Sequence, residues 1–285
     1  MRCQIVLFLF VITLLFGCEQ QQATAPDRGK VYASPAYLQY FGEAPAPQQG
    51  YVFAHVGYLP LADDSAQVRP IPLFMFSENQ QLDRILSQLF SERLLVAEQS
   101  KLRMPFAEGV RLTQLDQAGS TLIVSLELTR DVPSHLLAGI ERATVESAVQ
   151  FEEVDRVRIL YSGEPSERQP VEGYRHQPLA ITDVQLPLLL DAVGSWQPGE
   201  KEVEEVFFNF DRPVKVERFE LKGEAGNPLE GDYYLGMFDM AVVLRPQQAE
   251  LFQPGMTLHV DWQVEDRKGR KSKASSKLNL IGSQQ

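Results

Sequence analysis

The spacing of apolar residues changes along this chain, and the change limits the folds open to it. One stretch has apolar residues at intervals of three and four: Leu82, Ile85, Leu86, Leu89, Phe90 and Leu94. That spacing predicts an amphipathic helix. From Thr121 to Leu128 apolar and polar residues alternate instead, which predicts a strand with one buried face. Beyond residue 178 the alternating pattern dominates. We therefore predict an α+β domain over 51–165 and an all-β domain over 179–285.

Local signals order the elements of the first domain. The run Tyr51 to Leu61 is strand-like, and Ser77 stands three residues before Gln80, a spacing typical of a capping box at the start of the first helix. Strands at Val110–Leu115 and Thr121–Leu128 flank the segment 116–119, where Gly119 suits the positive φ of a hairpin turn.

A second helix is predicted to open near Pro133, with a buried face made of Leu137, Ile140, Thr144, Ala148 and Phe151. Alternation from Val157 to Tyr161 predicts a final strand. The resulting order is strand, helix, hairpin, helix, strand, which favours helices packed on one face of a small mixed sheet.

This segment resembles the GerMN domain, a module named for the germination lipoprotein GerM. The resemblance rests on the leucine-rich helix, on the stretch from Met104-Pro105 to Gly109-Val110-Arg111-Leu112, and on Val154-Asp155-Arg156-Val157-Arg158-Ile159 with Gly163. The chain departs from the family after the first helix, where Leu94-Leu95-Val96-Ala97 replaces the usual Gly-Pro. The resemblance implies a non-catalytic interaction role, because these domains share the small ring-building layout of secretion and sporulation proteins.

The second domain follows a polar linker over 166–178 and shows short strands separated by Gly and Pro. We predict strands at Glu204–Phe210, Val214–Leu221, Tyr233–Leu244 and Met256–Val264, which favours a β-sandwich. The pattern from Phe208 to Gly269 resembles bacterial Ig-like domains, including the CopC-like copper carriers. Asp266-Arg267-Lys268-Gly269 stands where those carriers have a histidine, so the resemblance implies their fold without copper.

The N-terminus predicts export. After Arg2, the run Ile5–Phe16 is apolar except for one Thr and is too short to span a bilayer, so it suits a signal peptide over 1–17. Leu15-Phe16-Gly17-Cys18 resembles a lipobox, which implies lipid on Cys18. An uncleaved anchor helix or a buried free cysteine is the alternative. Cys3 leaves with the signal, so no disulfide can form within the mature chain. Glu19 favours the outer membrane, and residues 18–50, rich in Gln, Pro and Ala, are predicted to form a tether.

Charge and motifs exclude several functions. A net charge of −11 argues against nucleic acid as a partner. His55, His135, His176 and His259 are too dispersed to suggest a metal site, and the chain contains no Gly-x-Ser-x-Gly. Neither helix begins with a phosphate-binding Gly-rich loop. We therefore expect no enzyme activity, no metal and no cofactor.

One candidate binding surface remains, a basic cluster made of Arg267, Lys268, Arg270, Lys271, Lys273 and Lys277. It either blunts an edge strand, a common use of Lys, or contacts an anionic envelope partner. The functional hypothesis is a lipid-anchored interaction or scaffold protein of the cell envelope. Phe207 and Tyr234 are candidate docking residues, and the alternative for the apolar residues of these strands is a packed core. The alternative is a periplasmic ligand or glycan carrier whose site lies between the two domains.

Overall fold

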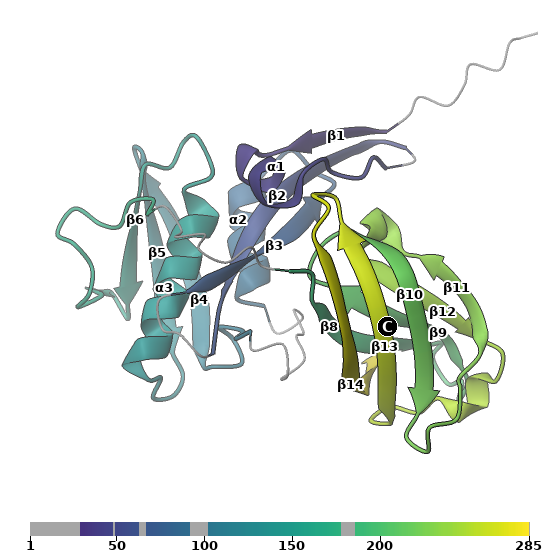
Figure 1. Ribbon diagram of the computed structural model, residues 1–285. Helices are drawn as coiled ribbons and strands as arrows, with labels where there is room; N and C mark the ends of the chain where they lie inside the picture. Colours follow the sequence, from purple (N-terminus) through teal and green to yellow (C-terminus); the bar gives the residue numbers. More distant parts are fainter. Residues whose placement is uncertain (1–28, 48, 63–66, 92–101, 178–185, 285) are drawn as a thin grey trace, which may run out of the picture.

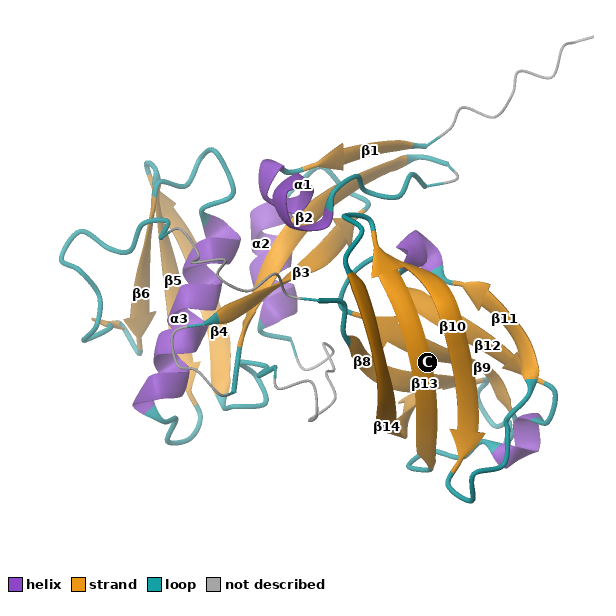
Figure 2. Cartoon of the chain, viewed as in Figure 1, coloured by secondary structure: helices purple, strands orange, loops and turns teal. Residues whose placement is uncertain are grey.

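The computed structural model describes residues 29–47, 49–62, 67–91, 102–177 and 186–284 (Figure 1). The first domain contains β1 (Lys30–Ala33), α1 (Pro35–Phe41), β2 (Tyr51–Pro60), β3 (Val68–Met75), α2 (Gln81–Leu89), β4 (Val110–Ala118), β5 (Thr121–Leu128), α3 (Ser134–Ala148), β6 (Arg156–Tyr161) and β7 (Glu164–Pro165). The second contains β8 (Leu189–Trp196), β9 (Val203–Phe210), β10 (Val214–Gly223), β11 (Gly231–Leu235), β12 (Ala241–Pro246), β13 (Thr257–Asp266) and β14 (Lys271–Gln284), with 3-10 turns η3 (Met237–Asp239) and η4 (Ala249–Leu251). The chain is therefore α+β, as predicted (Figure 2).

The first domain contains two small mixed sheets, where a single sheet was predicted. One has the order β1-β2-β3, and the other has the order β4-β5-β6-β7. Pro70 and Pro72 interrupt the hydrogen-bonding capacity of β3, because proline has no backbone N–H to donate. Strand β3 lies at the edge of its sheet, where prolines are tolerated, and the sheet ends at this strand.

Helix α3 lies between the two sheets and completes the backbone bonding of β2. Strand β1 ends at Ala33, opposite Ala54, so the later residues of β2 lack a neighbour on that side. Gln150 fills this gap by bonding both the N–H and the C=O of Val56, at 3.0 and 2.6 Å. The Tyr58 N–H donates to the hydroxyl of Ser147 at 3.0 Å. Buried backbone groups need such partners, which ties β2 to α3.

Residues 30–41 are not part of a free tether, which corrects the boundary predicted at residue 50. Ser34 caps α1 by accepting a hydrogen bond from the Tyr37 N–H at 3.1 Å, and Pro35 occupies the first turn. Tyr37 and Phe41 are almost completely buried. These aromatic side chains bury enough apolar surface to order a segment whose Gln, Pro and Ala content alone predicts a coil.

The helix boundaries differ in detail from the sequence predictions. Ser77 forms no capping box, because α2 begins after Gln80, whose backbone has a left-handed φ of 57°. The predicted buried face of α2 is confirmed from Leu82 to Leu89, while Leu94 lies outside the described residues. The buried face of α3 is wider than predicted, because both sheets and the segment after β7 cover it, and it includes Glu141 and Glu146.

The hairpin of the first domain is confirmed with a shorter turn. Strand β4 continues to Ala118, which pairs with Thr121 of β5, so only two residues form the turn. Gly119 adopts a φ of 61°, a conformation that favours glycine in such turns. Leu122, Val124 and Leu126 are buried as the alternation predicted, whereas Leu128 is 36% exposed at the end of the strand.

The second domain is one seven-stranded sheet, ordered β10-β13-β14-β8-β9-β12-β11, that curls into two layers (Figure 1). Strand β14 joins the layers: residues 271–279 pair with β13, and residues 280–284 pair with β8 in parallel. A strand that changes partner in this way forms the corner of a sandwich. The strand predicted over Tyr233–Leu244 is divided by η3 into β11 and β12, and β8 and β14 were not predicted. Phe208, Phe210 and Trp262 lie in the core.

Candidate functional site

The basic cluster lies on the hairpin between β13 and β14. Asp266, whose side chain is 1% exposed, organises the turn by accepting hydrogen bonds from the N–H groups of Lys268 and Arg270, both at 2.9 Å. This arrangement places the first three basic side chains of the cluster next to helix α1 of the first domain. The structure therefore divides the six predicted residues into two groups.

The first group, Arg267, Lys268 and Arg270, contacts other parts of the protein. The Lys268 ammonium donates to the carbonyl of Gln39 at 2.7 Å, and the Arg270 guanidinium donates to the carbonyl of Tyr40 at 2.7 Å. Arg267 pairs with Asp239 in the η3 turn. Two of these cations thus satisfy carbonyls in the last turn of α1, where positive charge is favourable.

Behind this contact lies a chain of buried and half-buried charges, which we call the junction network: Arg69, Asp211, Arg212, Asp266 and Arg270. Asp211 accepts hydrogen bonds from Arg69 Nε at 2.9 Å and from Arg212 Nη2 at 2.9 Å. Arg212 Nη1 in turn donates to Asp266 at 3.2 Å. Arg69 belongs to β3 of the first domain, so the network links the two domains.

The electrostatics of Asp211 follow from these contacts. Its side chain is fully buried, and burial alone raises the pKa of a carboxyl group. Arg69 and Arg212 together outweigh burial and hold the pKa of Asp211 below its usual value. The N–H of Leu188 also donates to this carboxylate at 2.7 Å. Asp211 therefore stays ionised inside the protein, and its charge holds the two arginines in place.

Aromatic contacts complete the junction. The ring of Phe238 in η3 stacks on Phe74 of β3 with centroids 4.1 Å apart. The Arg212 guanidinium lies over the ring of Phe41, 5.6 Å from its centroid. Phe238 and Asp239 both have positive φ, at 59° and 56°, which is uncommon for residues other than glycine. This backbone conformation directs Phe238 toward β3 and Asp239 toward Arg267.

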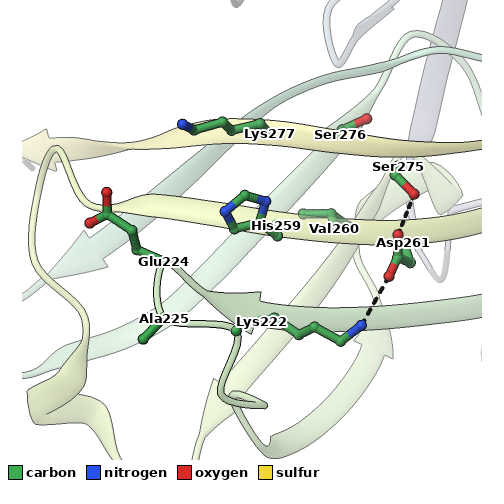
Figure 3. Close-up of a pocket in the computed structure, with 10 residues that line it drawn as sticks. Lys222, Glu224, Ala225, His259, Val260, Asp261, Ser275, Ser276 and Lys277 are labelled. Atoms are coloured by element: carbon green, nitrogen blue, oxygen red, sulfur yellow. Dashed lines mark hydrogen bonds and ion pairs between the residues drawn. The ribbon is translucent and has the colours of Figure 1, made fainter.

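The second group of basic residues, Lys271, Lys273 and Lys277, lies on β14. Lys271 pairs with Glu217 at 2.5 Å and with Glu265 at 3.3 Å. Lys277 lines an open depression of about 490 Å³ together with Lys222, Glu224, His259 and Asp261 (Figure 3). Lys222 pairs with Asp261 at 3.2 Å. Because two lysines face two carboxylates, the depression has no excess positive charge, and the predicted anionic contact remains a prediction.

The segment predicted as a linker is fastened to the first domain by Glu141 of α3. This carboxylate is 2% exposed and accepts hydrogen bonds from Arg168 Nη2 at 2.7 Å, Ser166 Oγ at 2.7 Å and Tyr174 Oη at 2.8 Å. Burial acts to raise the pKa of Glu141, but the bonds from Arg168, Ser166 and Tyr174 outweigh it and lower the pKa. A polar segment of this kind carries no periodicity, so sequence patterns do not reveal the attachment.

Other predicted features have definite positions. Cys18 lies outside the described residues. Within the ranges that the structure describes, no group of three His, Cys, Asp or Glu side chains is arranged to hold a metal ion. No helix in those ranges is long and apolar enough to cross a membrane. His55 bonds Gln81 at 2.8 Å and stacks on Phe151. A ligand site between the domains stays a prediction.

Comparison with known proteins gives likenesses of fold. No family model and no curated protein matches the sequence. The first GerMN domain of the sporulation protein GerM from Bacillus subtilis is structurally similar, with 17% identity, 43% of this chain and 93% of that chain covered, and a TM-score of 0.30. PcoC, a methionine-rich copper resistance protein from Escherichia coli, is similar with 14% identity over 34% of this chain and 99% of that chain, at a TM-score of 0.25. CopC from Methylosinus trichosporium is similar with 11% identity over 35% and 97% of the two chains, at a TM-score of 0.24.

Proposed function

We propose that this chain is a lipid-anchored protein of the bacterial cell envelope that binds a protein partner and catalyses no reaction. The proposed anchor is lipid on Cys18, and Glu19 favours delivery to the periplasmic face of the outer membrane. The support for the anchor is the lipobox-like Leu15-Phe16-Gly17-Cys18 behind a short apolar run. Anchoring and partner binding are separate parts of the proposal, and each has its own test.

The observation that carries the binding role is a row of apolar side chains across five neighbouring strands. Cross-strand pairing places the members of this outer row side by side: Ile281, Val193, Phe207, Val243 and Tyr234. The alternate positions of the same strands fill the core, so the row belongs to the opposite, outer face of the sheet. Val243 in this row is fully buried and Ile281, Val193 and Phe207 are half-buried, whereas Tyr234 is 41% exposed. The part of the row that is open to a partner is therefore its Tyr234 end.

Tyr234, at the β11 end of the row, is fixed in position by two neighbouring side chains. Its side chain is 41% exposed, and its hydroxyl donates to Glu205 at 2.7 Å. Arg245 also donates to Glu205, at 2.9 Å, and its guanidinium lies over the Tyr234 ring, 5.4 Å from the centroid. Tyrosine and arginine are enriched at binding hot spots, and a side chain fixed in advance loses little entropy on binding.

A photo-crosslinking residue at position 234 tests the partner surface in cells. We expect a discrete adduct from this position and none from Val171, which is 96% exposed on the first domain. Arg245→Glu should abolish the adduct, because it inverts a charge at the row without affecting a buried residue. Equal adducts from both positions, or an adduct that survives Arg245→Glu, would contradict the proposal.

The anchor is tested by Cys18→Ser. We expect the wild-type protein to incorporate radiolabelled palmitate and to fractionate with the outer membrane. The variant should incorporate no label and appear in the soluble periplasmic fraction. Wild-type protein that remains unlabelled and soluble would refute the anchor while leaving the partner surface to be judged by crosslinking.

A further inference from the structure

Three aromatic side chains form a stacked group on the ribbon of β1 and β2, which runs along the upper edge of the molecule in Figure 1. The ring of Tyr32 stacks on Tyr51 with centroids 6.2 Å apart and on Phe53 with centroids 5.3 Å apart. Tyr32 is 50% exposed and Tyr51 is 56% exposed. We call these three residues the aromatic patch.

The patch lies on the face of β2 opposite the buried residues that contact α1. Val52, Ala54 and Val56 are fully buried on that other face. On the patch side Phe53 reaches the main core of the domain, and the two tyrosines extend beyond it. Single exposed aromatic residues are common on protein surfaces. Here Tyr51 stacks on Tyr32, and Tyr32 stacks on Phe53, which packs against the core. The three rings therefore form a rigid surface whose exposure the fold maintains.

The chemistry of tyrosine suits one environment in particular. Its ring is apolar and its hydroxyl is polar, and such side chains gather where hydrocarbon meets water at a membrane surface. The register also pairs Tyr51 with Lys30, whose side chain is exposed. A cation beside the rings complements phosphate headgroups, although the chain as a whole is acidic with a net charge of −11.

The position of the patch brings it close to the proposed anchor. Strand β1 begins at Lys30, twelve residues after Cys18. Even a fully extended chain of that length reaches at most about 43 Å, so Cys18 and β1 cannot separate further. A link of this length gives an effective concentration in about the millimolar range. A patch with only millimolar affinity for lipid would therefore be bound much of the time.

We propose that the aromatic patch is a lipid-contacting surface that rests on the headgroup layer and fixes the orientation of the protein on the membrane. This inference depends on the proposed lipid anchor at Cys18. Contact through the patch gives the protein a second attachment point next to the anchor. The domain then faces its partner in one orientation, whereas an anchor alone would let it rotate freely.

The test supplies the anchor chemically. In the mature chain Cys18 is the sole thiol, so a maleimide lipid couples to it in vesicles of phosphatidylethanolamine and phosphatidylglycerol. Tyr51→Trp provides the probe, and Tyr233→Trp on β11, at a site 41% exposed, is the matched control. The signal of the unsubstituted protein, from Trp196 and Trp262, is subtracted from both.

Brominated lipids should quench about half of the emission that the new tryptophan adds in the Tyr51→Trp protein. A patch whose dissociation constant for lipid equals the millimolar effective concentration is bound about half of the time. The Tyr233→Trp protein should show no comparable quenching, and adding Tyr32→Ser to Tyr51→Trp should weaken the effect. Equal quenching of probe and control would overturn the proposal. A spectral shift of the probe caused by soluble cell-wall glycan in the absence of vesicles would also overturn it, in favour of a glycan platform. Because the lipid is coupled in vitro, neither outcome depends on lipidation in cells.

Discussion

Two buried aspartates of the seven-stranded domain should respond in opposite ways to replacement by asparagine. Asp211 is fully buried between Arg69 and Arg212, and these cations hold its pKa below the usual value. Asp211→Asn removes the carboxylate that pairs with Arg69 and leaves Arg212 paired with Asp266. Breaking a buried ion pair in this way costs about 3–5 kcal/mol, and the partial exposure of Arg69 favours the lower end, about 3 kcal/mol.

Asp191 is the matched control on strand β8. Its side chain accepts a hydrogen bond from Asn209 at 2.6 Å, and burial raises its pKa from 3.8 to about 6. Each pKa unit corresponds to about 1.4 kcal/mol, so keeping Asp191 ionised at pH 7 costs the folded state about 3 kcal/mol. Asp191→Asn removes that charge and should stabilise the domain by up to this amount.

The two residues also predict different pH dependence. The folded-state pKa of Asp191 lies above its unfolded value, so the folded state binds more protons between them. Its unfavourable contribution should therefore disappear as the pH falls from about 7 to about 4. The pKa of Asp211 is lowered, so its stabilising contribution is present above the unfolded value and is lost as the pH falls through the folded-state pKa.

Urea unfolding followed by tryptophan fluorescence measures both effects, because Trp196 and Trp262 both belong to this domain. We expect a lower midpoint for Asp211→Asn and a higher one for Asp191→Asn at pH 7, and the gain from Asp191→Asn should vanish near pH 4. The reasoning is refuted if Asp211→Asn changes the free energy of unfolding by less than about 0.5 kcal/mol, the range of neutral surface substitutions. It is also refuted if the two variants lose the same free energy of unfolding.

Three further substitutions examine the other contacts. Glu141→Gln should lower the free energy of unfolding by roughly 2–3 kcal/mol, because it weakens charged hydrogen bonds. It should also speed hydrogen exchange in the segment around Tyr174, and unchanged exchange would contradict this. Arg270→Gln should make the two domains unfold in separate calorimetric transitions, whereas Lys273→Gln should behave as wild type; identical traces would exclude a role for Arg270 in the junction. Phe238→Gly relieves a left-handed backbone worth about 1–2 kcal/mol but removes the ring contact with β3. The isolated second domain should therefore gain stability, whereas the whole chain should gain less or lose stability. A larger loss in the isolated domain would rule this out.

Sequence periodicity predicted the elements whose stability depends on an apolar face. The faces of α2 and β5 were identified from Leu82 to Leu89 and from Leu122 to Leu126, because burial at a fixed spacing is a local property of the chain. Such patterns do not say which sheet a strand joins. The separation of β1-β2-β3 from the second sheet follows from the edge position of β3 and from the bonds that Gln150 makes to β2, a contact across 94 residues.

Segments ordered by polar or isolated aromatic contacts were harder to predict. The stretch around Tyr37 and Phe41 has the composition of a coil, yet those two residues, which are only 0% and 2% exposed, hold it in place. The segment around Ser166 and Tyr174 has no apolar period, and one carboxylate on α3 attaches it. In both places a few contacts with distant residues outweigh the local composition, and the composition of a segment does not show them.

The basic cluster shows how such contacts change a functional hypothesis. Positive charges crowded on one hairpin of an acidic chain suggest an external anion. Lys268 and Arg270 instead satisfy carbonyls of α1 that lie 229 and 230 residues earlier in the chain. Because the end of a helix needs donors wherever the fold places it, charge clustering on a hairpin can reflect an internal requirement. The partner surface is then better sought at Tyr234, whose hydrogen bond to Glu205 and exposed ring leave one side open to solvent.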